Sequence, residues 1–122
     1  MNYSKQRETM LNILRSTTSH PTANDIYVEM RKNDPKISLG TVYRNLAMLT
    51  EMGIILRLDT EHDSVHYDGC VAPHYHFVCN DCRKVIDLDI EPINVDKQIN
   101  EKHGCNVSSH TLIFYGTCSE CK

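Results

Sequence analysis

Cys79-Asn80-Asp81-Cys82 and Cys118-Ser119-Glu120-Cys121 constrain the architecture of this 122-residue chain more than any other segments. Each is a CxxC pair, and 35 residues separate the two. Two such pairs suit a tetrahedral zinc site, because each wraps the ion through a tight turn and four thiolates complete its coordination shell. We predict a structural Zn²⁺ bound by Cys79, Cys82, Cys118 and Cys121. A dithiol redox couple is the alternative that one CxxC pair would permit.

The composition is that of a folded soluble protein. It is 40% hydrophobic and 24% charged, with five Gly and four Pro, which excludes collagen-like, low-complexity and fully disordered classes. No apolar run approaches the ~20 residues of a membrane span, and the first residues do not form a signal peptide. We therefore expect a cytoplasmic protein without a membrane partner. Thiols stay reduced in that compartment, so six cysteines favour metal ligation over disulfides.

The chemistry of the sequence changes near its midpoint. All six cysteines follow residue 69, and His20 is the only histidine in the first half. Residues 1–60 contain eight Lys/Arg and six Asp/Glu (net +2), whereas residues 61–122 contain five and ten (net −5). These differences predict two domains, residues 1–68 and 74–122, joined by a hinge at 69–73.

The first half has the pattern of a winged helix-turn-helix. Helical periodicity predicts helices over about 3–17, from a cap at Thr22 to before Pro35, and from a cap at Ser38 to Gly53. Two apolar runs, 54–58 and 65–67, flank the polar turn 60–64 and predict a hairpin.

The third helix of such a fold enters the major groove of DNA. We predict that its outward residues contact phosphates and base edges, with Arg44 as the base reader. The predicted DNA-binding residues are Ser38, Thr41, Tyr43, Arg44 and Asn45. The same helices could also be a scaffold without a nucleic-acid partner, since a net charge of +2 is weak for a DNA-binding domain.

A second, chemically different metal site is predicted beside the zinc site. Residues 74–79 read as a strand, on which His74 and His76 share a face. Asp87 lies on the expected partner strand, and Asp68 precedes His74 by six residues. Imidazoles and carboxylates suit Fe(II), Mn(II) or Zn(II). The remaining histidines of the predicted hairpin, His62 and His66, are expected to be solvated.

The C-terminal third predicts a helix of about ten residues from Pro92 and a long strand over 107–115. Apolar residues on both faces of that strand favour a homodimer. Glu91 and His110 could form an auxiliary metal site, although a hydrogen-bonded strand histidine is the commoner outcome. Cys70 and Cys105 lie outside the CxxC pattern and are expected to be packed thiols. The fold class is α+β: an N-terminal winged helix-turn-helix domain followed by a small α/β dimerisation domain with a four-cysteine zinc site.

Taken together, these motifs resemble the ferric uptake regulator family, and most closely its peroxide-sensing, PerR-type branch. The motifs that carry the resemblance span almost the whole chain: His20-Pro21-Thr22-Ala23, Thr41-Val42-Tyr43-Arg44-Asn45-Leu46, His74-Tyr75-His76, Phe114-Tyr115-Gly116 and the four zinc-site cysteines. Asp68 favours the peroxide-sensing branch, because the iron-sensing branch usually has Glu in that region. Many relatives carry an extra N-terminal helix, which we expect to be short or absent here.

The resemblance implies a dimeric, metal-dependent repressor that binds a palindromic double-stranded operator, and not an enzyme. It implies a regulatory Fe²⁺ or Mn²⁺ bound by His20, Asp68, His74, His76 and Asp87. It also implies that hydrogen peroxide oxidises His20 or His74 through the iron, after which metal and DNA are released.

Two other functions remain open from the residues alone. One is a sensor of iron, zinc or manganese availability with the same fold and no peroxide chemistry. The other is a metal-dependent hydrolase or thiol oxidoreductase, although the sequence places no candidate general base beside the metal.

Overall fold

The computed structural model describes residues 3–71 and 74–122, with side chains from residue 5 onward. The chain divides into two compact units, Met1–Ala72 (unit 1) and Pro73–Lys122 (unit 2). Residues 72 and 73 of the predicted hinge 69–73 lie outside the described residues. Within the described ranges, no helix is both long and apolar enough to cross a membrane.

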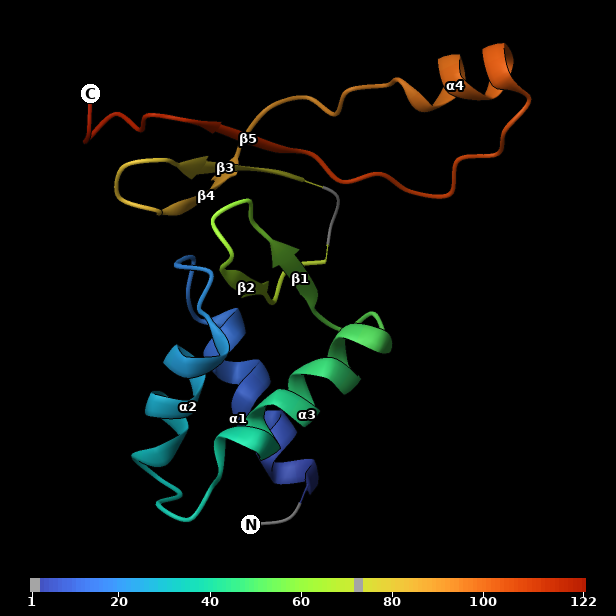
Figure 1. Cartoon of the computed structure of the whole chain (residues 1–122). Helices are drawn as coiled ribbons and strands as arrows, with labels where there is room; N and C mark the ends of the chain where they lie inside the picture. The colour runs from blue at the N-terminus through green and yellow to red at the C-terminus, as the bar shows by residue number, and fades with distance from the viewer. Residues whose placement is uncertain (1–2, 72–73) are drawn as a thin grey trace. The chain divides into compact units, whose positions relative to one another are not determined.

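Unit 1 consists of three helices followed by a hairpin (Figure 1). The elements are α1 (Tyr3–Arg15), α2 (Ala23–Arg31), α3 (Leu39–Glu51), β1 (Leu56–Asp59) and β2 (Val65–Asp68). β1 and β2 are antiparallel, with Leu58 opposite His66. This order of helices and strands confirms the predicted α+β fold with an N-terminal winged helix-turn-helix.

Local sequence signals set the helix boundaries of unit 1. Thr22 caps α2 in a reciprocal capping box with Asp25, and the Ser38 side chain accepts a hydrogen bond from the Thr41 amide. Gly53, at φ +75°, follows the end of α3. The apolar stripes of the helices meet in one core, which includes Met10, Leu14, Ile26, Met30, Val42, Leu46, Leu49, Ile55 and Tyr67.

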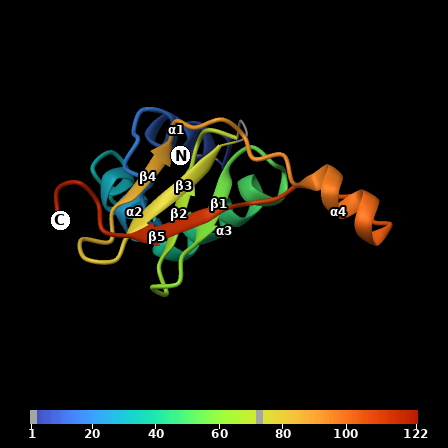
Figure 2. The same cartoon turned by 90° about the horizontal axis from the view of Figure 1, so that it is seen from above.

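Unit 2 is built on a three-stranded sheet. β3 (Tyr75–Cys79) lies between β4 (Val85–Leu88) and β5 (Ile113–Gly116), as Figure 2 shows. β4 is antiparallel to β3, and β5 is parallel to it. The connection from β4 to β5 carries α4 (Asp96–His103), which is closed by Gly104 at φ 66°.

Two predicted elements of unit 2 are shorter than the sequence suggested. The predicted strand 107–115 is ladder-paired only over Ile113–Gly116, which lies beside His76–Cys79 of β3. The predicted helix from Pro92 begins at Asp96, where Val95 provides no side-chain cap. Residues 107–112 belong to the predicted strand but have no ladder partner in the structure.

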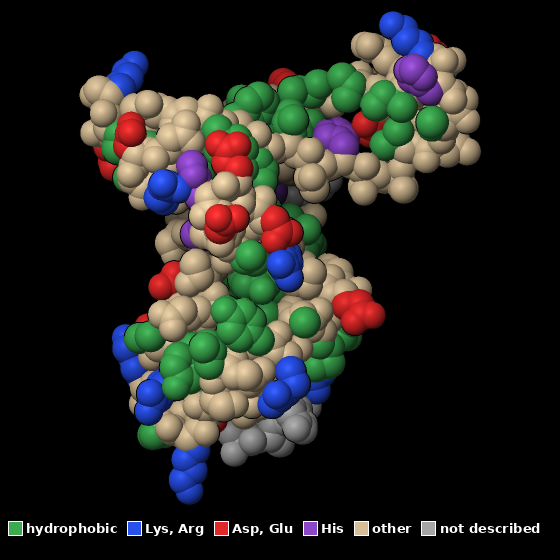
Figure 3. All heavy atoms as spheres, viewed as in Figure 1, with side chains coloured by type: hydrophobic (Ala, Val, Ile, Leu, Met, Phe, Trp, Pro, Cys, Tyr) green, Lys and Arg blue, Asp and Glu red, His purple; other side chains and the backbone are tan. Residues whose placement is uncertain are grey.

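Exposed apolar side chains gather on unit 2. Figure 3 shows hydrophobic side chains along the segment between the sheet and α4. The large hydrophobic residues that unit 2 exposes are Ile90, Ile93, Val95, Ile99 and Phe114, and we refer to them together as the apolar face of unit 2. Exposed apolar surface of this kind is typical of a protein–protein interface.

Candidate metal centres and DNA-binding helix

The four CxxC cysteines form one cluster in unit 2. One sulfur atom from each of Cys79, Cys82, Cys118 and Cys121 lies within 4.8 Å of the others. The Cys82 and Cys118 sulfurs are 3.8 Å apart. A tetrahedron with Zn–S bonds of about 2.3 Å places its sulfurs about 3.8 Å apart, so the cluster fits a zinc ion. The loop from β3 to β4 supplies one pair and the segment after β5 supplies the other.

The backbone prepares this cluster to hold thiolates. The amides of Cys82 and Cys118 point at the sulfur of Cys79, at 3.5 and 3.4 Å, and lower the pKa of that thiol to about 6. The thiols of Cys118, Cys82 and Cys79 raise the pKa of Cys121 to about 12. The Cys79 thiolate therefore forms readily, whereas the neighbouring thiols oppose ionisation of Cys121. A bound divalent cation would favour the thiolate form of all four cysteines.

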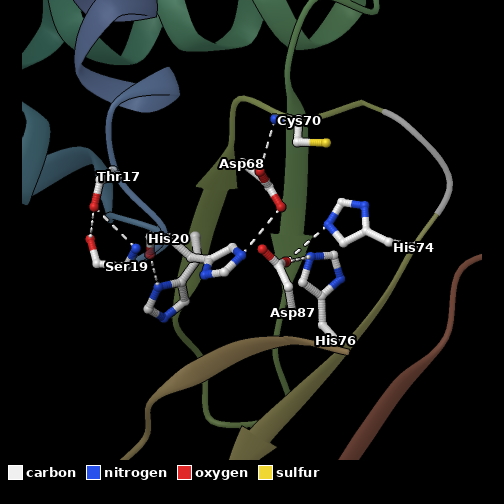
Figure 4. A network of polar contacts seen from close by, with 9 residues as sticks. Thr17, Ser19, His20, Asp68, Cys70, His74, His76 and Asp87 are labelled. Carbon is white, nitrogen blue, oxygen red and sulfur yellow. Dashed lines mark hydrogen bonds and ion pairs between the residues drawn. The ribbon is translucent and has the colours of Figure 1, made fainter. Parts of the chain in front are cut away.

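Unit 1 pairs a histidine with a carboxylate. His20 lies between α1 and α2, and its Nε2 is 3.2 Å from Oδ2 of Asp68 at the end of β2 (Figure 4). The other Asp68 oxygen accepts a hydrogen bond of 2.9 Å from the Cys70 amide, which fixes the carboxylate. Both side chains are buried, with exposed fractions of 2% and 9%. Burial of a carboxylate requires such partners.

Unit 2 pairs two histidines with a second carboxylate. His74 and His76 place their Nε2 atoms 3.0 and 3.2 Å from the same oxygen of Asp87 (Figure 4). The strand register produces this arrangement, because His76 is directly opposite Asp87 in the β3–β4 ladder. The two imidazole rings lie side by side with centroids 4.4 Å apart. The predicted convergence of His74, His76 and Asp87 is thus present within unit 2.

These donors fit a divalent metal of intermediate hardness. Neutral imidazole and carboxylate are the ligands that Fe(II), Mn(II) and Zn(II) share. Each Nε2 faces a carboxylate oxygen, so exchange of the shared proton for a metal ion would leave both atoms as ligands. Unit 1 offers two such donor residues, His20 and Asp68, and unit 2 offers three, His74, His76 and Asp87.

His110 has different neighbours from those predicted. Its Nδ1 is 2.9 Å from Oδ1 of Asp96, the first residue of α4, and its Nε2 is 2.9 Å from the Tyr75 hydroxyl. The Tyr75 hydroxyl also accepts a hydrogen bond of 2.8 Å from the Ile93 amide. The carboxylate against His110 is that of Asp96 and not that of Glu91. The sequence alone does not indicate Asp96, because its approach to His110 depends on the path of the chain between β4 and β5.

The exposed side of α3 presents Tyr43 and Arg44, and Thr41 is half-buried. The Thr41 hydroxyl accepts a hydrogen bond of 3.0 Å from the Arg44 guanidinium, and it lies 2.9 Å from the hydroxyl of Ser38. The predicted outward orientation of Asn45 is wrong, because this residue is 2% exposed. Val42, Asn45, Leu46 and Leu49 share the inward face, as the spacing i, i+3, i+4, i+7 requires.

His66 is not a solvated wing residue. It is half-buried in β2, and its Nδ1 lies 2.6 Å from the main-chain oxygen of His20. Cys70 and Cys105, expected to be packed, are both exposed.

Comparison with known proteins places the chain among metal-responsive regulators. The ferric uptake regulator family matches residues 1–115. The peroxide-responsive repressor PerR of Staphylococcus aureus is 32% identical over 118 residues, covering 96% of this chain and 80% of PerR. The crystal structure of the Campylobacter jejuni peroxide stress regulator aligns with a TM-score of 0.85 at 31% identity, covering 97% of this chain and 90% of that one. The Helicobacter pylori ferric uptake regulator Fur, whose structure reveals three functional metal binding sites, aligns with a TM-score of 0.85 at 27% identity, covering 99% and 82%.

Proposed function

Because the chain belongs to the ferric uptake regulator family, we propose that it is a repressor whose affinity for DNA depends on a regulatory metal ion and is lost when hydrogen peroxide reacts at that ion. Regulators of this family bind DNA and act as dimers. The chain is accordingly a transcriptional regulator and not an enzyme.

The regulatory ion takes ligands from both units in this proposal. The five ligands are His20, Asp68, His74, His76 and Asp87. The observation that carries the proposal is the pairing of histidine Nε2 atoms with carboxylate oxygens in each unit, at 3.0 to 3.2 Å. Two carboxylates also balance the charge of one divalent ion, and one of them, Asp68, is buried.

The sensing chemistry follows from this ligand set. Fe(II) held by these five N/O ligands would supply the cleavage of the peroxide O–O bond, in which one oxygen atom is added to the ring of a ligand histidine and the other leaves as water, a reaction that Mn(II) would not supply. The histidines in question are His20 and His74. Oxidation of the His20 ring would remove a ligand that belongs to unit 1, the unit that carries Arg44. Affinity for metal and affinity for DNA are linked, so losing one lowers the other.

Two features favour peroxide sensing. Asp68 occupies the position where the iron-sensing branch usually has Glu, and the Staphylococcus aureus relative is a peroxide-responsive repressor. The second candidate function is a sensor of iron, zinc or manganese availability. The similarity to a Fur structure favours it, and it predicts no oxidation of His20 or His74.

The cysteine cluster has a structural role in this proposal. Its four sulfurs would enclose a Zn²⁺ completely, which leaves no open position for a substrate or an oxidant. The ion would tie the segment after β5 to the β3–β4 turn.

The apolar face of unit 2 is the proposed homodimer interface. In a symmetric dimer the same surface of each protomer meets its copy. Two α3 helices related by a two-fold axis would then meet two half-sites, which predicts a palindromic operator. Thr41, Tyr43 and Arg44 are the proposed contacts of α3, and Ser38 holds the start of that helix.

Selection from a pool of random duplexes by the Mn(II)-loaded, zinc-replete protein tests this function. We expect inverted repeats to be enriched, and we expect Arg44→Ala to weaken binding to the selected duplex about 10- to 100-fold, because a bidentate base contact contributes about 1–3 kcal/mol. Fluorescence anisotropy measures both proteins on the same duplex.

Lys97→Ala is the matched control, since it removes one positive charge from the exposed surface of α4. It should bind the duplex as the wild type does. Enrichment of no sequence, or equal losses in both variants, would mean that α3 does not read DNA.

A further inference from the structure

His20 is held in an unusual backbone conformation. Its φ is 53°, in the left-handed region that residues other than glycine rarely adopt. The neighbouring carbonyl groups are both bound by β2: that of His20 faces Nδ1 of His66 at 2.6 Å, and that of Pro21 accepts the Tyr67 amide at 2.9 Å. Strand β2 therefore secures the turn that carries His20.

The ring of His66 is oriented at both of its nitrogen atoms. A carbonyl oxygen can only accept, so Nδ1 carries the proton and donates it to His20. In a neutral imidazole with this tautomer Nε2 is an acceptor, and the Ser64 hydroxyl lies 3.1 Å from it. That hydroxyl is in turn 2.7 Å from the hydroxyl of Thr60, across the turn between β1 and β2. The hairpin thus fixes the position from which His66 donates.

One strand holds His20 at two points. His66 and Asp68 are two residues apart in β2, so they share a face of the strand. Oδ2 of Asp68 lies 3.2 Å from Nε2 of the His20 imidazole, and Nδ1 of His66 lies 2.6 Å from the main-chain oxygen of His20. Tyr67, between them, turns to the opposite face and is buried in the core of unit 1, which anchors the strand.

We propose that His66 is a positioning residue for the metal ligand His20: its hydrogen bond to the His20 carbonyl keeps the left-handed turn in place and so directs the His20 imidazole to the metal. This inference rests on the proposed function, because it assumes that His20 is a ligand. It adds a residue from the hairpin that acts on the metal site through the main-chain turn that carries His20. Partners that orient metal ligands in this way typically change metal affinity about 10- to 100-fold when they are removed.

The test compares two nearly isosteric replacements in the full, zinc-replete protein. His66→Asn keeps an N–H donor near the position of Nδ1, and His66→Leu removes it. The dissociation constant for Mn(II) and the visible spectrum of bound Co(II) report on the regulatory site, and zinc content with the thermal midpoint reports on folding. We expect His66→Leu to weaken Mn(II) binding at least about tenfold and to alter the Co(II) bands, and His66→Asn to restore affinity to within about threefold of wild type.

His62→Leu, in the turn between β1 and β2, is the control and should bind Mn(II) as the wild type does. If His66→Leu does not fold, His66→Phe replaces it as the variant without a donor. Equal Mn(II) affinity in wild type and the variant without a donor would overturn the positioning role, as would an equal loss in His66→Asn. If the wild type binds no Mn(II), or His20→Ala binds it unchanged, the proposed regulatory site is itself wrong and the role of His66 falls with it.

Discussion

Cys118→Ser is expected to unfold unit 2 while unit 1 stays folded. The apolar core cluster of the described residues lies entirely in unit 1. Unit 2 buries few large apolar side chains, chiefly Tyr75, Val78 and Val85, and leaves several isoleucines exposed. A structural zinc ion contributes about 10–16 kcal/mol of folding free energy, which is comparable to the whole stability of a small domain, about 5–15 kcal/mol. Loss of one thiolate at the buried centre of the cluster removes most of this contribution.

Three measurements follow this variant. Elemental analysis should show loss of the one zinc per chain that the cluster is proposed to hold, limited proteolysis should cleave within residues 74–122, and sedimentation should show a monomer. Cys105→Ser is the control, because Cys105 is an exposed thiol outside the cluster. A Cys118→Ser protein that retained zinc and a protected unit 2 would rule out the structural role of the cluster.

His20→Ala is expected to abolish the dependence of DNA binding on metal while zinc content and dimerisation stay unchanged. In regulators, coupling between two sites typically changes affinity about 5- to 150-fold. We expect Mn(II) to raise the operator affinity of the wild type by an amount in this range and to leave that of His20→Ala unchanged. The reason is that His20 and Asp68 are the only proposed ligands from unit 1. Without the imidazole, the ion would have no nitrogen ligand in unit 1, the unit proposed to bind DNA.

A second variant is needed because His20 has a positive φ. At a φ of 53°, asparagine is tolerated better than alanine, so His20→Asn removes the imidazole with less strain. Both variants should lose the Mn(II) enhancement in an anisotropy titration with operator duplex, and His62→Ala should keep it. If His20→Asn still responded to Mn(II) as the wild type does, the regulatory ion would not depend on unit 1 in the way proposed.

Local signals made much of the fold predictable. Thr22 and Ser38 cap their helices as their sequence context indicates, and Gly53 follows the end of α3. The alternation of residue types around His74 and His76 predicts both the strand and the face that the two histidines share. In the β3–β4 register, Asp87 then lies opposite His76. Capping and periodicity depend on residues close in sequence, so a single sequence carries enough information to find them.

Features that depend on distant neighbours were not predictable in the same way. The extent of β5 depends on its pairing with β3, and the partner of His110 depends on where α4 begins. The bond from His66 to His20 spans 46 positions of sequence. Asn45 is different: helical spacing alone places it beside Val42 and Leu49, so its burial was available from the sequence and was misread.

The most direct test of the account is peptide mass spectrometry after brief, stoichiometric peroxide treatment of zinc-replete protein loaded anaerobically with Fe(II), beside a Mn(II)-loaded sample. We predict the gain of one oxygen atom on the peptide carrying His20 or His74, in the iron sample only, with loss of operator binding in the same sample. Unmodified histidines in the iron sample would contradict peroxide sensing and favour a sensor of metal availability. Oxidised cysteines with loss of zinc at the same dose would instead make the cysteine cluster the sensor.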